Sequence, residues 1–367
     1  MNILYLTNHL NIGGITTYVL TLSSGLRKRG HSVYVASSGG QLLGQFIEKG
    51  VVYIPIPIKT KQELSPKIII SRFKLSGMIK KYRIDILHSN SRTTQVLGCL
   101  LSRAEGIPHI STCHGFFKKR LSRKLFPCWG KKVIAISQQV SDHLMRDFAV
   151  NRDDIAVIHN GIDVNKAKTS SPKSKMEIRN NLGLGDGPVV GIIARLSDVK
   201  GHTYLIKAMP AVLKRIPQAQ LLIVGEGKMK KDLEKLVEDL KIKKSVFFMP
   251  SVENTRDVLS VMDLFVMPSL EEGLGLALME AMSCGLPVIA SNIGGIRSLI
   301  VHNTNGLLVE PADVDGLSIA ISGLLQNTEK AKSLGQAAQI FISENFSQEK
   351  MVLETERVYE ECLNVKS

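Results

Sequence analysis

The sequence predicts an α/β protein with two doubly wound domains, each built around a parallel β-sheet. Short apolar runs alternate with longer amphipathic stretches along the 367 residues, which is the rhythm of βαβ units. The runs fall into two series, separated by a polar stretch rich in Ser, Pro and Lys (DVNKAKTSSPKSKMEI, 163–178). A chain of this length also exceeds a comfortable single core, so we expect two domains.

Each apolar run is a predicted strand, and the polar stretch marks the domain boundary. In chain order the first series is NILYLT, SVYVAS, VVYIPI, IDILHS, PHISTC and KKVIAIS, and the second is PVVGIIA, AQLLIVG, SVFFMP, DLFVMPS, LPVIAS and NGLLV. We place a Rossmann-like N-terminal domain at 1–165 and a Rossmann-like C-terminal domain at 166–345. Residues 346–367 have the pattern of one amphipathic helix, which can pack on either domain, the N-terminal one included.

The composition is that of a soluble globular protein in a reducing compartment, and we expect the cytosol. Hydrophobic residues make up 44% of the chain and charged residues 22%. The opening MNILYLTNHL has no basic lead, so it predicts a strand rather than a signal peptide, and no apolar run approaches the roughly 18 residues of a membrane span. The five cysteines are scattered without a C-x-x-C pair, which signals neither a disulfide framework nor a zinc site.

The net charge of +14 lies entirely in the first half of the chain. Residues 1–165 contain 23 Lys and Arg against 9 Asp and Glu, whereas residues 166–367 contain 24 of each class. A one-sided basic surface indicates an anionic partner for the first domain, which leaves nucleic acid, phospholipid and acidic substrates open.

Loops after strands are the first places to look for a site, because ligands of open α/β sheets bind at the carboxyl ends of the strands. Gly13 and Gly14 follow the first predicted strand and allow a phosphate or sugar to approach, although a pair of glycines also suits a plain βα turn. His114 ends a later strand and is a candidate general base or hydrogen-bond donor; the alternative is a histidine satisfied by backbone. His9 and His88 also end strands, and we expect structural or supporting roles for them.

Two further loops carry charged groups in the second domain. Arg195 and Lys200 follow its first strand, and two cations there can clamp a diphosphate; a solvated surface pair is the alternative. In the run EEGLGLALMEAMSCGLPVIAS, which starts at residue 271, glycines at the entrance of a predicted helix can offer N–H groups to a phosphate. Glu280 lies inside that helix, where its carboxylate can accept hydrogen bonds from a ribose diol, and Glu272 faces what lies beyond the phosphates. An unpaired carboxylate on a largely apolar helix is costly, which disfavours a purely structural Glu280.

Taken in order, these motifs resemble the family 4 retaining glycosyltransferases of the GT-B fold over nearly the whole chain. The succession is the G-G loop, H-G, N-G-I-D at 160–163, R-L-x-x-x-K-G, G-E-G at 225–227, Pro-Ser at 268–269, the E-x7-E pair and GLPVIAS. The family usually has Phe where this chain has Leu274, and Gly where it has Ala194, and both departures are conservative.

The resemblance implies a catalytic and donor-binding site without a metal or other cofactor. Arg195 and Lys200 would neutralise the departing nucleoside diphosphate, Glu272 would hold the transferred sugar, and Glu280 the ribose. His114 completes the catalytic candidates, and Val252 is a candidate for contacts to the base. The remaining candidates for donor binding are Gly13, Gly14, Gly273, Leu274 and Gly275. The resemblance further implies two domains that face a central cleft, with the donor on the second and the acceptor mainly on the first.

We therefore expect a retaining glycosyltransferase that moves a sugar from a nucleotide diphosphate sugar, with a UDP-sugar favoured, to a hydroxyl of a glycan or lipid-linked acceptor. Cell-surface polysaccharide, lipopolysaccharide or glycolipid synthesis is the expected setting. The alternatives are a nucleotide-sugar epimerase of the same fold and a non-catalytic binder of nucleotide sugar or nucleic acid. No zinc finger, RNA-binding or helix-turn-helix pattern is present in the sequence, so nucleic acid is not expected as a partner.

The segment 116–132 predicts where the acceptor is held. It contains seven Lys and Arg and no acid, interleaved with aromatic residues, a composition that suits an anionic membrane surface. The alternative is a solvated basic face whose aromatic residues belong to the core. We expect a peripheral enzyme on the cytoplasmic face of a membrane, and the patch residues are Phe117, Lys118, Lys119, Arg120, Arg123, Lys124 and Trp129.

Overall fold

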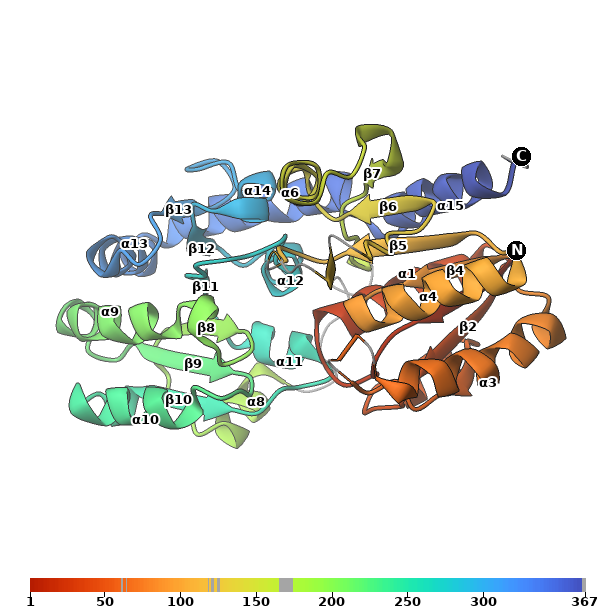
Figure 1. Cartoon of the computed structure of the whole chain (residues 1–367). Coiled ribbons are helices and arrows are strands. Elements are labelled where there is room, and N and C mark those ends of the chain that lie inside the picture. The colour runs from red at the N-terminus through yellow and green to blue at the C-terminus, as the bar shows by residue number, and fades with distance from the viewer. Residues whose placement is uncertain are drawn as a thin grey trace. The chain divides into compact units, whose positions relative to one another are not determined.

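The chain folds into two compact units, each with its own parallel sheet (Figure 1). The computed structural model describes residues 1–60, 62–63, 65–117, 119, 122–123, 126–164 and 174–364. Unit 1 comprises Met1–Gly161 together with Gln348–Ser367, and unit 2 comprises Ile162–Ser347. The predicted α/β class with two doubly wound sheets is therefore confirmed.

Unit 1 contains a seven-stranded sheet in the order β3-β2-β1-β4-β5-β6-β7, and every neighbouring pair is parallel. The order reverses between β1 and β4, so the loops that follow these two strands diverge there and leave room for a ligand. The strands are β1 (Asn2–Leu6), β2 (Ser32–Ser37), β3 (Val52–Pro55), β4 (Ile86–Ser89), β5 (His109–Cys113), β6 (Lys132–Ala135) and β7 (Ile155–Val157).

Helices cover both faces of this sheet, as the alternation along β1 requires. Ile3 and Tyr5 belong to one core cluster, and Leu4 and Leu6 belong to another. Successive side chains of a strand point to opposite faces, so both faces of β1 are buried. The helices are α1 (Gly14–Lys28), α2 (Leu43–Glu48), α3 (Pro66–Tyr82), α4 (Arg92–Glu105), α6 (Gln138–Phe148) and α15 (Gln348–Asn364), with a short 3-10 turn η1 (Arg152–Asp154).

Helix α15 belongs to unit 1 although it comes after all of unit 2 in the chain. It packs beside α1, where Gly25 is required because a Cβ atom there would lie 2.4 Å from Cγ2 of Val352 (Figure 1). Glu356 forms ion pairs with Arg29 at 2.6 Å and His31 at 2.5 Å. The side chains that α15 adds to the core are Met351, Val352, Val358, Tyr359 and Cys362.

Unit 2 contains a six-stranded parallel sheet in the order β10-β9-β8-β11-β12-β13, and all six predicted strands are present. The strands are β8 (Val189–Ile193), β9 (Gln220–Val224), β10 (Val246–Met249), β11 (Leu264–Met267), β12 (Val288–Ser291) and β13 (Leu307–Val309). The order reverses between β8 and β11, which makes the loops after these strands the candidate site.

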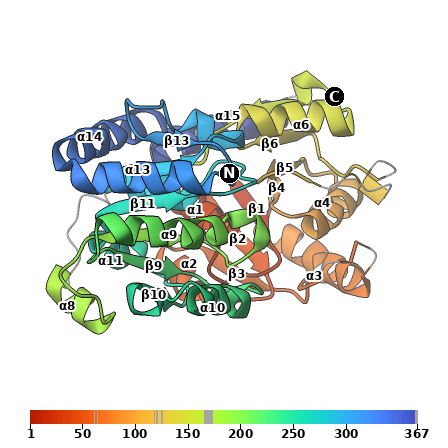
Figure 2. The same ribbon diagram turned by 90° about the vertical axis from the view of Figure 1, so that its left-hand side faces the viewer.

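The helices of unit 2 include α9 and α13, which pack side by side against the sheet (Figure 2). The α-helices are α8 (Lys175–Asn181), α9 (His202–Arg215), α10 (Lys230–Asp239), α11 (Thr255–Ser260), α12 (Leu276–Ser283), α13 (Val314–Gln326) and α14 (Thr328–Asn345). Short 3-10 turns are η2 (Asp198–Lys200), η3 (Lys243–Ser245) and η4 (Gly294–Ser298). Across the described parts of both units, every helix is too short or too polar to cross a bilayer.

Candidate functional site

The loop after β8 carries the two predicted cations of unit 2. Arg195 is exposed, and among the described residues no partner is found for its guanidinium group. The loop is held against the glycines that follow β9: a Cβ atom on Gly225 would lie 2.0 Å from the Ala194 carbonyl oxygen, and one on Gly227 would lie 2.2 Å from that of Leu196. The two glycines therefore allow close backbone packing, which fixes the backbone that carries Arg195.

Lys200 and Glu272 lie together at the carboxyl edge of the sheet. The Lys200 Nζ atom is 2.5 Å from Oε2 of Glu272, and both side chains are mostly buried. The pair joins the loop after β8 to the loop after β11, across the point where the strand order reverses. A buried ion pair needs good geometry to offset the loss of hydration, so this pair holds both charged groups in place.

Two further glycines allow close backbone contacts with the loop after β11. A Cβ atom on Gly201 would lie 1.7 Å from the Pro268 carbonyl oxygen, and one on Gly295 would lie 1.8 Å from that of Gly273. Gly201 also has a φ of 71°, a left-handed conformation that side chains oppose. A side chain at Gly201 would push the segment that carries Lys200 away from the loop after β11, and a side chain at Gly295 would displace the segment that carries Glu272.

The N-terminus of α12 is built to receive an anion. Gly275 precedes it with a φ of 96°, offers no side chain to cap the first N–H groups, and no acid lies in the first turn. The first N–H groups of a helix have no partner within it and carry partial positive charge. Leu274 is buried, so its side chain belongs to the core and is not available to a ligand.

Buried hydroxyl and imidazole groups without partners lie next to these loops in the sequence. His202 begins α9 and is buried, and burial, assisted by Lys200, lowers the pKa of its ring to about 4, so the ring is neutral at pH 7. Within the described part of the chain, no hydrogen-bond partner is found for either ring nitrogen of His202 or for the Ser269 hydroxyl group. Such groups are costly when left unpaired, which is typical of a surface prepared for a polar ligand.

The other predicted donor residues lie in the expected elements. Glu280 is on α12 and half-buried, close enough to Cys284 that its charge helps to raise the pKa of that thiol, whose main cause is burial. The predicted burial of the helix is correct for most of its apolar residues. Val252 is half-buried in the loop after β10.

In unit 1, His114 follows β5 and lies beside residues from two other elements. Its Nε2 atom is 3.1 Å from Oδ1 of Asn90, which follows β4, and its ring meets the ring of Tyr18 of α1 edge to face at 4.7 Å. Loss of hydration on burial lowers the pKa of the His114 ring to about 3, so the ring is neutral at pH 7. With Nε2–H donating to Asn90, the Nδ1 atom keeps a lone pair that can accept a proton or a hydrogen bond. Gly13 and Gly14 lie exposed at the start of α1.

A buried hydrogen-bond network continues from Tyr18 to α15. The Tyr18 hydroxyl oxygen is 3.1 Å from that of Thr112, which is 2.7 Å from Nε2 of His88. The Nδ1 atom of His88 is 2.6 Å from the hydroxyl oxygen of Tyr359, which in turn is 2.8 Å from that of Tyr5. Burial lowers the pKa of His88 well below its usual value, so His88 is a neutral, structural bridge. Sequence patterns missed this network because its five members come from five separate elements.

Two members of the predicted membrane patch are not on the surface, which corrects that part of the prediction. Arg123 is 7% exposed and Trp129 is 8% exposed. The Arg123 guanidinium lies 3.9 Å from the centre of the Phe117 ring and 5.6 Å from those of Trp129 and Phe148, so it forms the centre of an aromatic cluster. Cation–π attraction explains why these residues turn inward. Lys119 is exposed, whereas Lys118, Arg120 and Lys124 lie outside the described residues.

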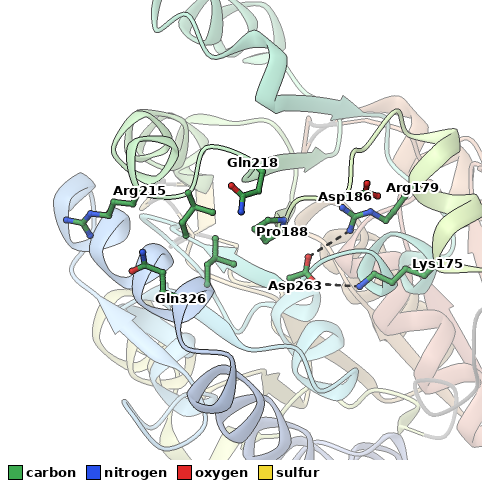
Figure 3. A pocket seen from close by; sticks show the side chains of 10 residues that line it. Lys175, Arg179, Asp186, Pro188, Arg215, Gln218, Asp263 and Gln326 are labelled. Carbon is green, nitrogen blue, oxygen red and sulfur yellow. Dashed lines mark hydrogen bonds and ion pairs between the residues drawn. The ribbon is translucent and has the colours of Figure 1, made fainter.

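A separate cavity of about 730 Å³ lies at the amino ends of β8, β9 and β11 (Figure 3). Asp263 accepts a hydrogen bond from the Val189 N–H at 2.9 Å and lies 3.5 Å from Lys175. Arg179 donates to the Gly185 and Gly187 carbonyl groups, as well as facing Asp263. Asp263, Lys175 and Arg179, which line the cavity, thus have structural partners. None of the predicted site residues lines the cavity.

The carboxyl edge of unit 2 is therefore the candidate site of this chain. The loops at this edge carry the exposed Arg195, the Lys200–Glu272 pair and the N-terminus of α12, which has no side-chain cap, and in doubly wound sheets this is the edge where ligands bind.

The chain belongs to glycosyltransferase family 4. Residues 12–166 match the family described as Glycosyltransferase Family 4, and residues 174–341 match Glycosyl transferases group 1. The chain is 32% identical over 271 residues to the Escherichia coli UDP-Gal:alpha-D-GlcNAc-diphosphoundecaprenol alpha-1,3-galactosyltransferase, covering 70% of this chain and 69% of that protein. Enzymes of the family are retaining hexosyltransferases that use nucleotide sugars without a metal, and this chain is one of them.

Two other similarities help to define the chain. It is 36% identical over 201 residues to the Corynebacterium glutamicum GDP-mannose-dependent monoacylated alpha-(1-6)-phosphatidylinositol monomannoside mannosyltransferase, covering 52% of each protein. Its fold matches that of Anabaena HepE, crystallised in complex with UDP-glucose, with a TM-score of 0.87 and 24% identity over 98% of this chain and all of that one. The expected GT-B fold is thereby confirmed.

Proposed function

We propose that this enzyme transfers a hexose from a UDP-sugar to a hydroxyl group of a lipid-linked or otherwise membrane-anchored glycan, in the synthesis of a cell-surface polysaccharide, lipopolysaccharide or glycolipid. The observation that carries the proposal is the Lys200–Glu272 pair at 2.5 Å: Lys200 lies two residues before α9, and Glu272 lies four residues before α12. The E. coli relative uses a UDP-sugar and a diphosphoundecaprenol-linked acceptor, and the C. glutamicum relative acts on a phosphatidylinositol mannoside.

In this proposal the donor binds to unit 2 with its diphosphate between the cations and the helix. Arg195 and Lys200 bind the phosphate oxygens, and the first N–H groups of α12 add hydrogen bonds and partial positive charge. Glycosidic bond cleavage places a negative charge on the leaving diphosphate, so these groups bind the transition state more tightly than the intact donor. They do so without a metal ion.

The carboxylates have separate tasks in the proposal. Glu272, oriented by Lys200, accepts hydrogen bonds from hydroxyl groups of the transferred sugar, and Glu280 accepts from the ribose. His114 is assigned to the acceptor side of unit 1, because the lone pair of a neutral imidazole can accept a hydrogen bond from the attacking hydroxyl group and orient it. Val252 lies where a base contact is expected, and Gly13, Gly14, Gly273 and Gly275 provide room for close approach.

The first test compares Arg195→Ala and Lys200→Ala with the parent by UDP release from UDP-glucose. We expect each substitution to lower kcat by about a hundredfold to a thousandfold, because each removes charge that stabilises the leaving group. Lys228→Ala is the matched control, since Lys228 is an exposed lysine paired only with the surface residue Asp198. Unchanged kcat in both test variants would contradict the proposal.

Simple measurements identify the nucleotide of the donor and the class of reaction. A thermal-shift series with UDP, GDP and ADP tests the base, since at one concentration the nucleotide with the lowest dissociation constant stabilises the fold most. Incubation with UDP-glucose alone, followed by sugar analysis, tests the epimerase alternative. An epimerised sugar would show that the enzyme is an epimerase and would contradict the proposed sugar transfer. Retention on duplex DNA that depends on salt would favour a nucleic-acid binder.

A further inference from the structure

Helix α3 of unit 1 exposes three large apolar side chains close together. Ile69 is 48% exposed, Ile70 is 55% exposed and Phe73 is 68% exposed. Residues three and four apart are neighbours on a helix, so the three side chains form one patch, which we call the α3 patch. The opposite side of α3 is already packed on the core through Ile68, Leu75 and Ile79. Single exposed apolar residues are ordinary, but a cluster on one helix marks an interaction surface.

The α3 patch is surrounded by positive charge. Between residues 66 and 83 the chain has no acid, and the six basic residues are Lys67, Arg72, Lys74, Lys80, Lys81 and Arg83. Acids close to this helix are already engaged: Glu105 accepts from Ser76 and lies 3.9 Å from Lys80, Glu63 pairs with Arg92 at 2.9 Å, and Asp85 accepts from the Asn2 N–H. The outward side of α3 therefore combines apolar tips with an excess of positive charge.

The position of α3 relates the patch to the candidate acceptor residues. The helix starts after β3, so its first turns, which carry the patch, begin on the carboxyl-edge side of the sheet where Asn90 and His114 also lie. Arg92 links this region to the loop after His114, because it donates both to Glu63 and to the Phe126 carbonyl oxygen, the latter at 2.6 Å. Phe126 is itself exposed.

We propose that the outward face of α3 is the surface by which unit 1 binds an anionic lipid bilayer. The α3 patch inserts at the headgroup boundary, while the lysines and arginines contact lipid phosphates. This inference rests on the proposed function, and it assigns the membrane contact to α3 in place of the inward-facing Arg123 and Trp129.

Charge and composition favour a bilayer over a protein as the occupant of this surface. Lysine is depleted at the centre of protein–protein interfaces, whereas the α3 patch is bordered by Lys67 and Lys74. A second copy of this chain would bring the same acid-free helix against itself, and like charges would repel. An anionic bilayer complements both the apolar and the positive parts of the surface.

The experiment measures co-sedimentation of the full chain with two kinds of vesicle, without donor or acceptor. One kind is phosphatidylcholine alone, and the other is an equimolar mixture with phosphatidylglycerol. We expect the parent to bind the mixed vesicles and to be released by high salt. The double substitution Ile69→Ser and Ile70→Ser should lower the partition coefficient about tenfold. Lys67→Gln with Lys74→Gln should lower binding to the mixed vesicles to a similar degree.

Matched control pairs come from unit 2. Ile319 and Ile340 are 59% and 58% exposed on α13 and α14, so Ile319→Ser with Ile340→Ser removes at least as much exposed apolar area from a different surface. Lys231→Gln with Lys235→Gln removes two exposed charges from α10. Equal binding by test and control pairs, or no binding of the parent to mixed vesicles, would overturn the proposal. So would a parent dimer that becomes a monomer when Ile69 and Ile70 are replaced.

Failure of this inference can be told apart from failure of the proposed function. The thermal shift given by UDP is measured on the same variants, and α3 carries none of the donor candidates. If the protein binds UDP and releases UDP from UDP-glucose but does not bind vesicles, the proposed donor chemistry stands and the proposed membrane-binding role of α3 fails. A protein that binds vesicles through α3 but gives no response to any nucleotide would show the reverse.

Discussion

At the scale of single residues, the histidines of unit 1 show how burial fixes protonation. Burial alone lowers the pKa of His109 to about 3, and its Nε2 atom is 2.8 Å from the Ser89 hydroxyl oxygen. Its folded-state pKa lies below the value near 6.5 expected in the unfolded chain. The unfolded chain therefore binds more protons below pH 6.5, so the stabilising contribution is complete above that pH and is lost as the pH falls towards 3.

This argument predicts a weaker pH dependence for His109→Gln. Between pH 6.5 and pH 5 the parent should lose about 2 kcal/mol of unfolding free energy from this one residue, and the variant should not. The fluorescence of Trp129 reports the unfolding of unit 1 in urea, because it is the only tryptophan and is buried in that unit. His302→Gln, at an exposed position in unit 2, is the control. An unchanged pH slope for His109→Gln would contradict the assignment.

At the scale of elements, glycines set the distances between the loops of unit 2. Gly295, in η4, donates its N–H to the Glu272 carbonyl oxygen at 3.3 Å, and its missing side chain leaves room for the Gly273 carbonyl group. The loop that carries Glu272 is thus shaped by a residue more than twenty positions later. A change that displaces η4 should therefore also change the shape of the candidate site.

We predict that Gly295→Ala destabilises unit 2 by about 2 kcal/mol and weakens UDP binding. The added Cβ atom would lie 1.8 Å from the Gly273 carbonyl oxygen, so the loop has to move. Gly323→Ala is the matched control, because a Cβ atom there meets nothing within 4 Å on α13, where alanine stabilises a helix by about 0.5–1 kcal/mol. Calorimetry with and without UDP measures both effects, and equal UDP binding by the two variants would contradict the prediction.

The elements also show how far sequence patterns reach. Local signals predicted twelve strands, because buried parallel strands are runs of apolar residues with turn signals at their ends. The pattern missed β7, whose three residues Ile155–Val157 are too short to stand out. It also placed Arg123 and Trp129 on the surface, because composition alone cannot tell an aromatic cluster around a cation from a membrane-binding face.

For the candidate site too, local sequence signals predicted single residues but not the contacts between distant segments. Arg195, Lys200 and Glu272 were found because each ends or follows a strand, and topology brings such loops to one edge. That Lys200 and Glu272 pair directly was not predictable, since it depends on the close packing at Gly201 and Gly295. The network from Tyr18 to Tyr359 could not be predicted either, because it needs the position of α15.

At the scale of the whole molecule, α15 completes a unit that the rest of the chain leaves open. Five of its side chains are buried in the core of unit 1, and burial of such side chains contributes about 1.5–3 kcal/mol each. Their sum is comparable to the total stability of an ordinary domain. The ion pairs of Glu356 with Arg29 and His31 add a polar connection at the same junction.

We therefore predict that a chain ending at residue 347 keeps a folded unit 2 but lacks a stable unit 1. Trp129 fluorescence should report an unfolded environment, while UDP should still raise the melting temperature, because the donor candidates of α12 and the loop after β8 lie in unit 2. A matched chain with all residues but with Glu356→Gln should keep both units folded. A native Trp129 signal from the shortened chain would refute this account.

The place of α15 in the chain also fixes the order in which the protein can be finished during synthesis. Roughly 190 residues of unit 2 separate α15 from the partners that it covers. At about 5–20 residues per second, a ribosome needs about ten to forty seconds to make them. Throughout that interval the newly made unit 1 lacks the side chains of α15 that complete its core, so it stays incompletely folded. The helix α15 of a neighbouring chain on the same messenger has the same side chains and can complete that core instead, which makes exchange of this helix the expected route to misassembled dimers.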